Sequence, residues 1–162
     1  MTSRTFASWV EPVAAKQADK AAEIVELARS IPSAAWELPS PLEGWSYKDL
    51  IAHLASNDDM RYLLNCVIAK EHADPDRFAI AGAAELNARE IAERRDRTVG
   101  ELIAEFEAQE TDNQDLYSRL TEDDKDWTQD DIPWTLGLAL TQAETGFHYR
   151  QHHEHLATAL DA

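Results

Sequence analysis

Apolar residues recur at every third or fourth position along most of this 162-residue chain, and no segment alternates apolar and polar residues over a sustained run. The first spacing places apolar side chains on one face of an α-helix, whereas a half-buried strand needs the second. Glycine, which weakens helices, occurs only five times. The chain is therefore predicted to be all-α: a four-helix bundle, forming one domain over residues 1–162 and long enough to bury its own core.

Two helices are predicted in the first half of the chain. The first runs from about Phe6 to Ile31, and the second starts at Ser46, forms a variant of the capping box with Asp49, and continues to about Ala69. The segment between them, "PSAAWELPSPLEGW", is a long linker because its prolines and glycine disfavour helix. The apolar stripe predicted for the first helix consists of Val10, Val13, Ala21, Ile24, Val25 and Ala28.

A third helical region is predicted from about Ala83 to Leu120. Thr98 and Glu101 form a second capping box, so we expect the region to break near Arg97. This break gives a short extra helix, followed by the third principal helix from Val99 onward.

The fourth principal helix is predicted to run from about Thr135 to Leu160. It follows an acidic connection, "TEDDKDWTQDDIPW", in which Trp127 and Trp134 are expected to anchor the loop on the bundle. The single cysteine, Cys66, lies in the apolar run "LLNCVIA" and is predicted to be a small core residue rather than a reactive thiol.

The charge of the chain excludes several classes of partner. Its formal net charge is −16, which repels a phosphate backbone and an anionic membrane. There is no apolar run long enough to span a membrane, and the N-terminal residues lack the apolar stretch of a secretory signal. We therefore expect a cytoplasmic protein that acts on a small molecule.

Four of the six histidines lie in "GFHYRQHHEHLATAL", on the predicted last helix. His148 and His152 are spaced i, i+4, so both side chains lie on one helix face and can point at a single metal ion. The same four-residue row begins and ends in leucine, which predicts that its middle faces the core; its members are Leu140, Glu144, His148, His152, Leu156 and Leu160. His155 is expected to flank this site, and His153 to face solvent.

A third histidine, His53, falls on the apolar stripe of the second helix. In a bundle this helix can lie beside the last one, and three histidines with an open coordination position form a known catalytic zinc arrangement. We therefore predict a divalent metal site of His53, His148 and His152. Imidazole ligands suit several metals, with zinc or nickel favoured here. Glu144 has the same spacing to His148 and stays an alternative ligand in place of His152, or a carboxylate that orients a ligand.

Two asparagines also fall on apolar stripes. Asn57 follows His53 by one turn, and Asn113 follows Phe106 at heptad spacing. Each is either bonded locally or solvated, or else contacts a substrate.

Three segments, "PLEGWSYKDLIAHLASNDD", "NAREIAERRDRTVGELIAEF" and "HYRQHHEHL", resemble the DinB-like superfamily, which includes the N-terminal domains of mycothiol-dependent maleylpyruvate isomerases. The resemblance implies a four-helix bundle, commonly dimeric, that binds a divalent metal through His53, His148 and His152. The isomerase branch of the family instead implies Glu144 as a ligand together with His148, in place of His152.

The resemblance also implies a reaction: transfer or isomerisation that uses a low-molecular-weight thiol such as mycothiol or bacillithiol. Maleylpyruvate isomerases carry a further C-terminal domain with catalytic residues, whereas this chain stops at Ala162, so that particular isomerisation is not implied. The alternatives are a metal-dependent hydrolase and a non-catalytic binding or resistance protein with the same bundle. No catalytic residue beyond the metal ligands is predicted.

Overall fold

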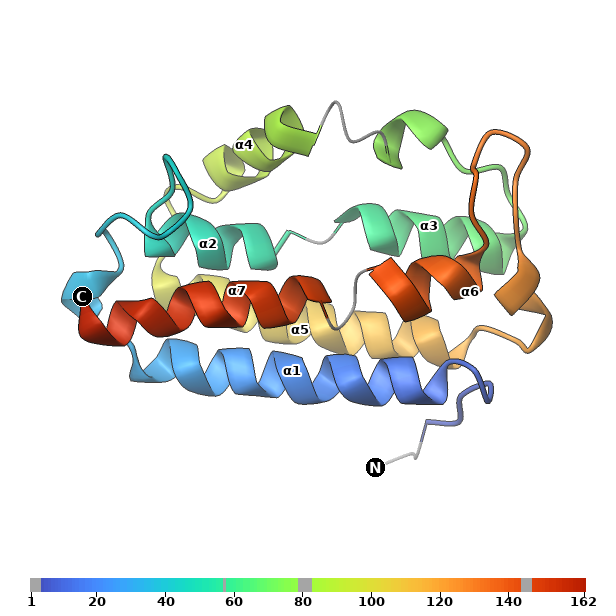
Figure 1. The fold of residues 1–162 in the computed structure, drawn as a ribbon, viewed down its shortest axis with the longest axis horizontal. Coiled ribbons are helices and arrows are strands. Elements are labelled where there is room, and N and C mark those ends of the chain that lie inside the picture. The colour runs from blue at the N-terminus through green and yellow to red at the C-terminus, as the bar shows by residue number, and fades with distance from the viewer. Residues whose placement is uncertain (1–3, 57, 79–82, 144–146) are drawn as a thin grey trace.

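Helices running side by side make up most of the computed structural model, which describes residues 4–56, 58–78, 83–143 and 147–162 (Figure 1). α1 spans Glu11–Ser30 and α5 spans Val99–Ser118, and the two pack against each other along their length. The described residues include two isolated β-bridges but no extended strand. The predicted all-α bundle is therefore confirmed.

The first helix begins later than predicted, because residues before Glu11 form turns rather than helix. Its predicted apolar stripe is buried throughout. The linker after it contains one short 3-10 turn, Ser33–Ala35, and then leads into α2, Tyr47–Leu54. The predicted capping box is present: the Ser46 hydroxyl accepts from the backbone N–H of Asp49, and the Asp49 carboxylate accepts from the backbone N–H of Ser46.

The prediction of one continuous second helix to Ala69 is wrong, because α2 ends at Leu54 and α3 spans Asp58–Ala69. The Ser56 hydroxyl donates to the carbonyl of His53 at 2.7 Å and thus competes with the helical hydrogen bond of that carbonyl. A polar run of Ser, Asn and Asp follows Ala55, and these residues favour local side-chain bonds over helix. The interruption fixes His53 in the last turn of a short helix.

The predicted break near Arg97 is confirmed. α4 spans Ala83–Glu93, and Thr98 caps α5 through a reciprocal capping box with Glu101. A 3-10 turn, Pro75–Phe78, precedes α4. α4 therefore forms a separate layer beside α2, on the side away from α1 (Figure 1).

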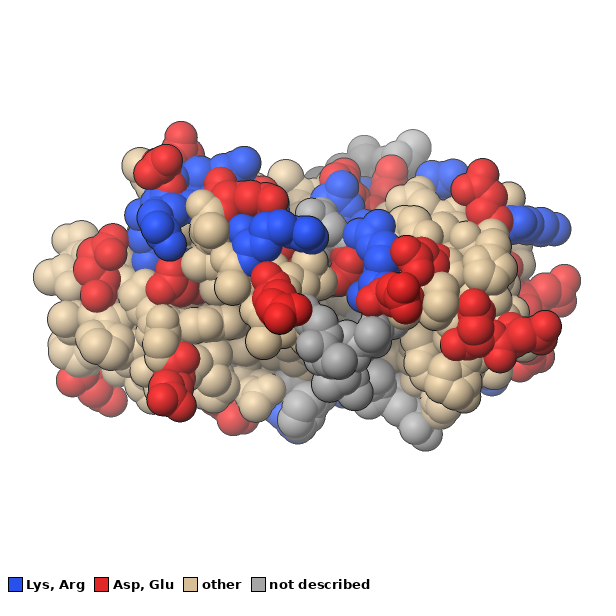
Figure 2. Space-filling view, turned by 90° about the horizontal axis from the view of Figure 1, so that it is seen from above, with Lys and Arg blue, Asp and Glu red and all other residues tan. Residues whose placement is uncertain are grey.

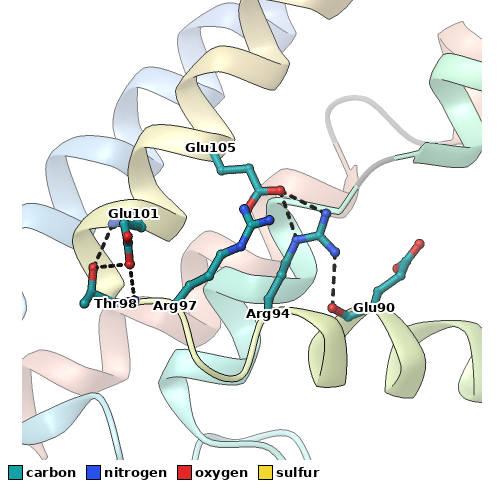
Figure 3. A network of polar contacts seen from close by, with 6 residues as sticks. All are labelled: Glu90, Arg94, Arg97, Thr98, Glu101 and Glu105. Atoms are coloured by element: carbon teal, nitrogen blue, oxygen red, sulfur yellow. Dashed lines mark hydrogen bonds and ion pairs between the residues drawn. The ribbon is translucent and has the colours of Figure 1, made fainter.

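Ion pairs tie α4 to α5 (Figure 3). The buried Arg94 donates to Glu105 through Nε at 3.2 Å and Nη2 at 3.0 Å, and through Nη1 to the carbonyl of Glu90 at 3.2 Å. Arg97 reaches the other oxygen of Glu105 from the connecting turn. The face above α4 carries basic and acidic side chains intermixed, which is typical of a solvated surface rather than of a nucleic-acid site (Figure 2).

The last predicted helix is also divided. Thr135 caps α6, Leu136–Leu138, which runs into a π-helical turn, Ala139–Ala143, before α7, Phe147–Ala157. A 3-10 turn, Thr158–Asp161, follows α7 and rotates Leu160 outward. Leu160 is 48% exposed, so the predicted burial of this row at Leu160 is wrong. Trp127 and Trp134 pack against the core as predicted.

The apolar interior consists of two clusters separated by polar residues. One cluster joins α2, α7, the second half of α1 and the first half of α5. The other joins α3, the first half of α1, the end of α5 and the segment before α7, and it contains the free Cys66, as predicted. Between the two clusters along the helices lies the middle layer, which we define as Gln17, Ser56, Gln109, Glu110 and Asn113.

None of the described helices combines the length and the apolar character needed to cross a membrane.

Candidate metal centre

α2 presents His53 to the interior. Its capping box fixes the first turn of the helix, and the interruption after Leu54 fixes the last. The Ser56 hydroxyl also lies 2.8 Å from Oε2 of the buried Glu90 on α4, so the end of α2 is attached to α4 as well as to its own carbonyls. Because His53 lies between these two fixed points, its backbone is held on both sides.

α7 supplies the other two imidazoles. His148 and His152 lie one turn apart on the face of α7 that packs against α1 and α2. His152 is buried, with 6% of its surface exposed, while Tyr149 and Leu156 anchor the same helix in the first apolar cluster. The helical period therefore directs both rings inward.

The three predicted histidines meet at one point. Nε2 of His53 lies 3.1 Å from Nε2 of His148, which lies 2.9 Å from Nε2 of His152. One ring nitrogen from each histidine lies within 4.8 Å of the others, and within the described residues these three form a group suited to holding a metal ion. Two nitrogens bound to one zinc at about 2.0–2.1 Å lie about 3.3 Å apart in tetrahedral geometry, so the observed spacing fits a shared ion.

Hydrogen bonds alone do not satisfy this cluster. A ring nitrogen carries either one N–H or one lone pair, so Nε2 of His148 can complete only one of its two contacts. The other contact then joins two nitrogens without a good donor and acceptor. A cation accepts a lone pair from all three nitrogens and removes this conflict.

Burial keeps all three rings neutral at pH 7. Loss of hydration lowers the pKa of His53 to about 3 and that of His148 to about 4. Burial, and then the neighbouring histidines, lower the pKa of His152 to about 2. Neutral imidazole is the form that binds metal, so no proton has to leave before the lone pairs become available.

Packing holds the rings in place. Trp45 lies beside His53 with ring centroids 5.0 Å apart, and His155 lies 5.6 Å from His152, which confirms that His155 flanks the cluster. Nδ1 of His53 and Nδ1 of His152 are buried without a hydrogen-bond partner among the described residues. Sequence reasoning did not identify Trp45 as a neighbour of His53, although the indole lies only eight residues before that histidine.

The remaining sequence expectations have different outcomes. His153 is half-buried rather than solvated, because its side chain approaches Glu23 of α1. Asn113 is completely buried, and neither its Nδ2 nor its Oδ1 has a hydrogen-bond partner among the described residues. Glu144, the alternative ligand, and Asn57 both lie outside the described residues.

A donor set of three neutral imidazoles fits a divalent cation. With such an ion bound, its double charge would stay uncompensated, which would favour an anionic further ligand.

Comparison with known proteins identifies the family of the chain. Residues 17–162 match the family described as the mycothiol maleylpyruvate isomerase N-terminal domain. Searches of curated proteins and of solved structures gave no match. Because the matched region covers most of the sequence, the chain belongs to the mycothiol maleylpyruvate isomerase N-terminal domain family of the DinB-like superfamily.

Proposed function

We propose that His53, His148 and His152 bind one divalent cation. We further propose that the protein is an enzyme that either transfers a low-molecular-weight thiol to a small electrophile or uses the thiol to isomerise that electrophile. The observation that carries this proposal is the convergence of three neutral Nε2 atoms from two helices. Family membership supports the metal and the thiol chemistry.

When bound, a zinc or nickel ion would supply a Lewis acid that lowers the pKa of a thiol. The residues of the chain would do the rest. The three imidazoles would hold the ion without neutralising its charge, and the buried surroundings of His152 exclude water from one side of the site. The indole of Trp45 gives the site an aromatic wall beside His53.

Three finer points belong to the same proposal. The electrophile is a small organic molecule, since the acidic surface disfavours nucleic acid. The enzyme acts in the cytoplasm, where free thiols stay reduced. The active form is a homodimer, a point that the resemblance to the family supports.

Metal analysis tests the site directly. Protein purified without a polyhistidine tag should contain about one divalent ion per chain by inductively coupled plasma mass spectrometry, as three protein ligands and an open position require. His53→Ala and His152→Ala should both lose it. His153→Ala, which alters the adjacent residue on the same helix, is the matched control and should keep it. If His152→Ala kept its full metal content and Glu144→Ala lost the metal, Glu144 rather than His152 would be the ligand.

A thiol assay tests the reaction. The metal-loaded protein is mixed with a fluorogenic haloalkyl electrophile and with mycothiol, bacillithiol or glutathione in turn. We expect one thiol to give turnover that His152→Ala abolishes. Turnover of an activated ester without any thiol would instead assign a hydrolase, and saturable binding at one equivalent without turnover would assign a binding protein.

A further inference from the structure

A cavity lies between α1 and α5, and its lining residues are different from those of the histidine cluster. Its volume is about 510 Å³, which is within the range of small-molecule sites. Short side chains on α1 create the space, and the buried Phe106 of α5 closes its inner side. The apolar residues that line it are Ala18, Ala21, Ala22, Val25 and Phe106.

Glu110 of the middle layer also lines this cavity, and no described residue forms an ion pair with its carboxylate. Oε2 accepts from Nε2 of Gln17 at 2.8 Å, and Oε1 accepts from Nε2 of Gln114 at 2.8 Å. Both donors are neutral amides. Burial raises the pKa of Glu110, which reflects the cost of keeping this charge away from water.

The basic residue that lines the cavity, Arg29, is already paired with another carboxylate. Nη2 of Arg29 lies 2.9 Å from each carboxylate oxygen of Glu107. Carboxylates that lose much of their hydration are normally paired with a cation. None of the described residues that donate hydrogen bonds to the half-buried Glu110 carries a positive charge.

Two buried polar side chains lie beside Glu110, and both lower the pKa of its carboxyl as weak hydrogen-bond donors. Asn113 and Tyr149 both approach the Glu110 carboxylate. Oδ1 and Nδ2 of Asn113 and the hydroxyl of Tyr149 are buried without a hydrogen bond of normal geometry to any described residue. Oδ1 of Asn113 and the carboxylate oxygens of Glu110 can accept further hydrogen bonds, so a ligand with N–H groups would find acceptors in this corner of the middle layer.

We propose that the α1–α5 cavity binds a primary ammonium compound with an apolar tail, with Glu110 as its counter-ion. The ammonium group supplies both the missing positive charge and N–H donors for the acceptors around Glu110. The tail lies along the alanines of α1 and the ring of Phe106. The net charge of −16 raises the local concentration of such cations.

Calorimetric titration with hexylamine tests the proposal, with hexanol, hexanoate and hexyltrimethylammonium as ligand controls. We expect hexylamine to bind at least about tenfold more tightly than hexanol, and hexanoate not to bind. Hexyltrimethylammonium should bind more weakly than hexylamine, because it has the charge without the donors. Hexanol binding as tightly as hexylamine, or no hexylamine binding up to about 10 mM, would overturn the proposal.

Two variants locate the site. Glu110→Gln should weaken hexylamine binding by at least about tenfold, and Asp112→Asn, which removes one exposed charge from the same helix, should not. Ala22→Leu fills the outer part of the cavity at an exposed position and should also block binding, whether or not Glu110→Gln folds. Unchanged binding in Ala22→Leu, or in folded Glu110→Gln, would contradict the assignment.

The titration separates this site from the metal centre. His152→Ala and chelated protein should bind hexylamine as the parent does, because no residue of the histidine cluster lines the cavity. Loss of hexylamine binding in His152→Ala would contradict an independent site. Failure of the metal analysis with normal hexylamine binding would overturn only the proposed enzyme.

Discussion

The histidine cluster and the surroundings of Glu110 are two polar groups in one helical interior, and they are incomplete in opposite ways. In the cluster, Nε2 of His148 faces two other ring nitrogens, so lone pairs and protons cannot be matched, although no charge is present. At Glu110 each carboxylate oxygen has its own amide donor, but no described residue brings a positive charge to it.

The difference shows that donors and charges must be counted separately when a buried polar group is assessed. The unmatched lone pairs of the histidine cluster favour a metal ion, which accepts lone pairs. The uncompensated charge at Glu110 favours an ammonium group, which brings a positive charge together with N–H donors. Chelation, pH and single substitutions should therefore affect the two places differently.

Removing the metal should give the largest effect. A ligand present at 1,000 times its Kd stabilises the fold by about 4 kcal/mol. For a chain of this size that corresponds to a loss of about 8–16 °C in Tm on chelation. Calorimetry of parent and Glu110→Gln should show the same loss, whereas His152→Ala should show none. A loss of Tm on chelation that persists in His152→Ala would contradict metal binding at the histidine cluster.

Acid should destabilise the chelated protein through the histidines before its carboxylates titrate. Above pH 6.5 these rings are neutral in both the folded and the unfolded state, so they do not change the free energy of unfolding. Below it the unfolded chain binds protons that the folded chain, with the pKa of His148 lowered to about 4, does not. Stability should fall by about 2 kcal/mol for His148 alone between pH 6.5 and 5.

Urea unfolding of the chelated protein at pH 8, 6.5 and 5 measures this loss. Saturating metal should shift the pH at which stability begins to fall to a lower value, because the ion competes with protons for the same nitrogens. A flat profile between pH 6.5 and 5 would mean that the imidazoles are not held neutral.

The support of His53 can be tested at Ser56. Ser56→Ala removes the hydroxyl that joins the carbonyl of His53 to Glu90. Loss of such supporting contacts commonly lowers metal affinity by about 10–100-fold. Competition with a chelating dye should show that loss, and Ser118→Ala, which removes a similar hydroxyl bond to a backbone carbonyl at the end of α5, should leave affinity unchanged.

Two tyrosines give the smallest and most selective test. Tyr117→Phe removes the hydroxyl that donates to Oε1 of Gln17 at 2.7 Å, and should cost about 1–3 kcal/mol because a buried acceptor is left unpaired. Tyr149→Phe removes a hydroxyl that lies beside Glu110 but makes no hydrogen bond of normal geometry to a described residue, and should change stability by less than about 0.5 kcal/mol. Equal losses in urea unfolding would show that the two hydroxyls do not differ.

Much of this fold could be predicted because local signals and the helical period agreed. The capping boxes at Ser46 and Thr98 marked two helix starts correctly, and the stripe of α1 marked the core. The interruption after Leu54 was missed, since it depends on a side-chain bond from Ser56 to a carbonyl and on Glu90, which is 34 residues away.

The same contrast holds for the interior polar groups. His53, His148 and His152 could be identified because each lies on an apolar face at a helical spacing. The proposed role of Glu110 could not be predicted from the sequence, because it depends on how α1 and α5 approach each other. The position of Gln17, four residues after Val13 and four before Ala21 on the buried stripe, was the available signal for a polar layer.

The two arginines that hold Glu105 differ in how strongly salt screens them. The side chain of Arg94 is 9% exposed and that of Arg97 is 48% exposed. Above physiological ionic strength the screening length in water falls below about 8 Å, which weakens exposed ion pairs far more than enclosed ones. Rising salt should therefore release Arg97 first and leave Arg94 on Glu105, so that α4 keeps its attachment to α5 and the end of α2 keeps Glu90 beside it.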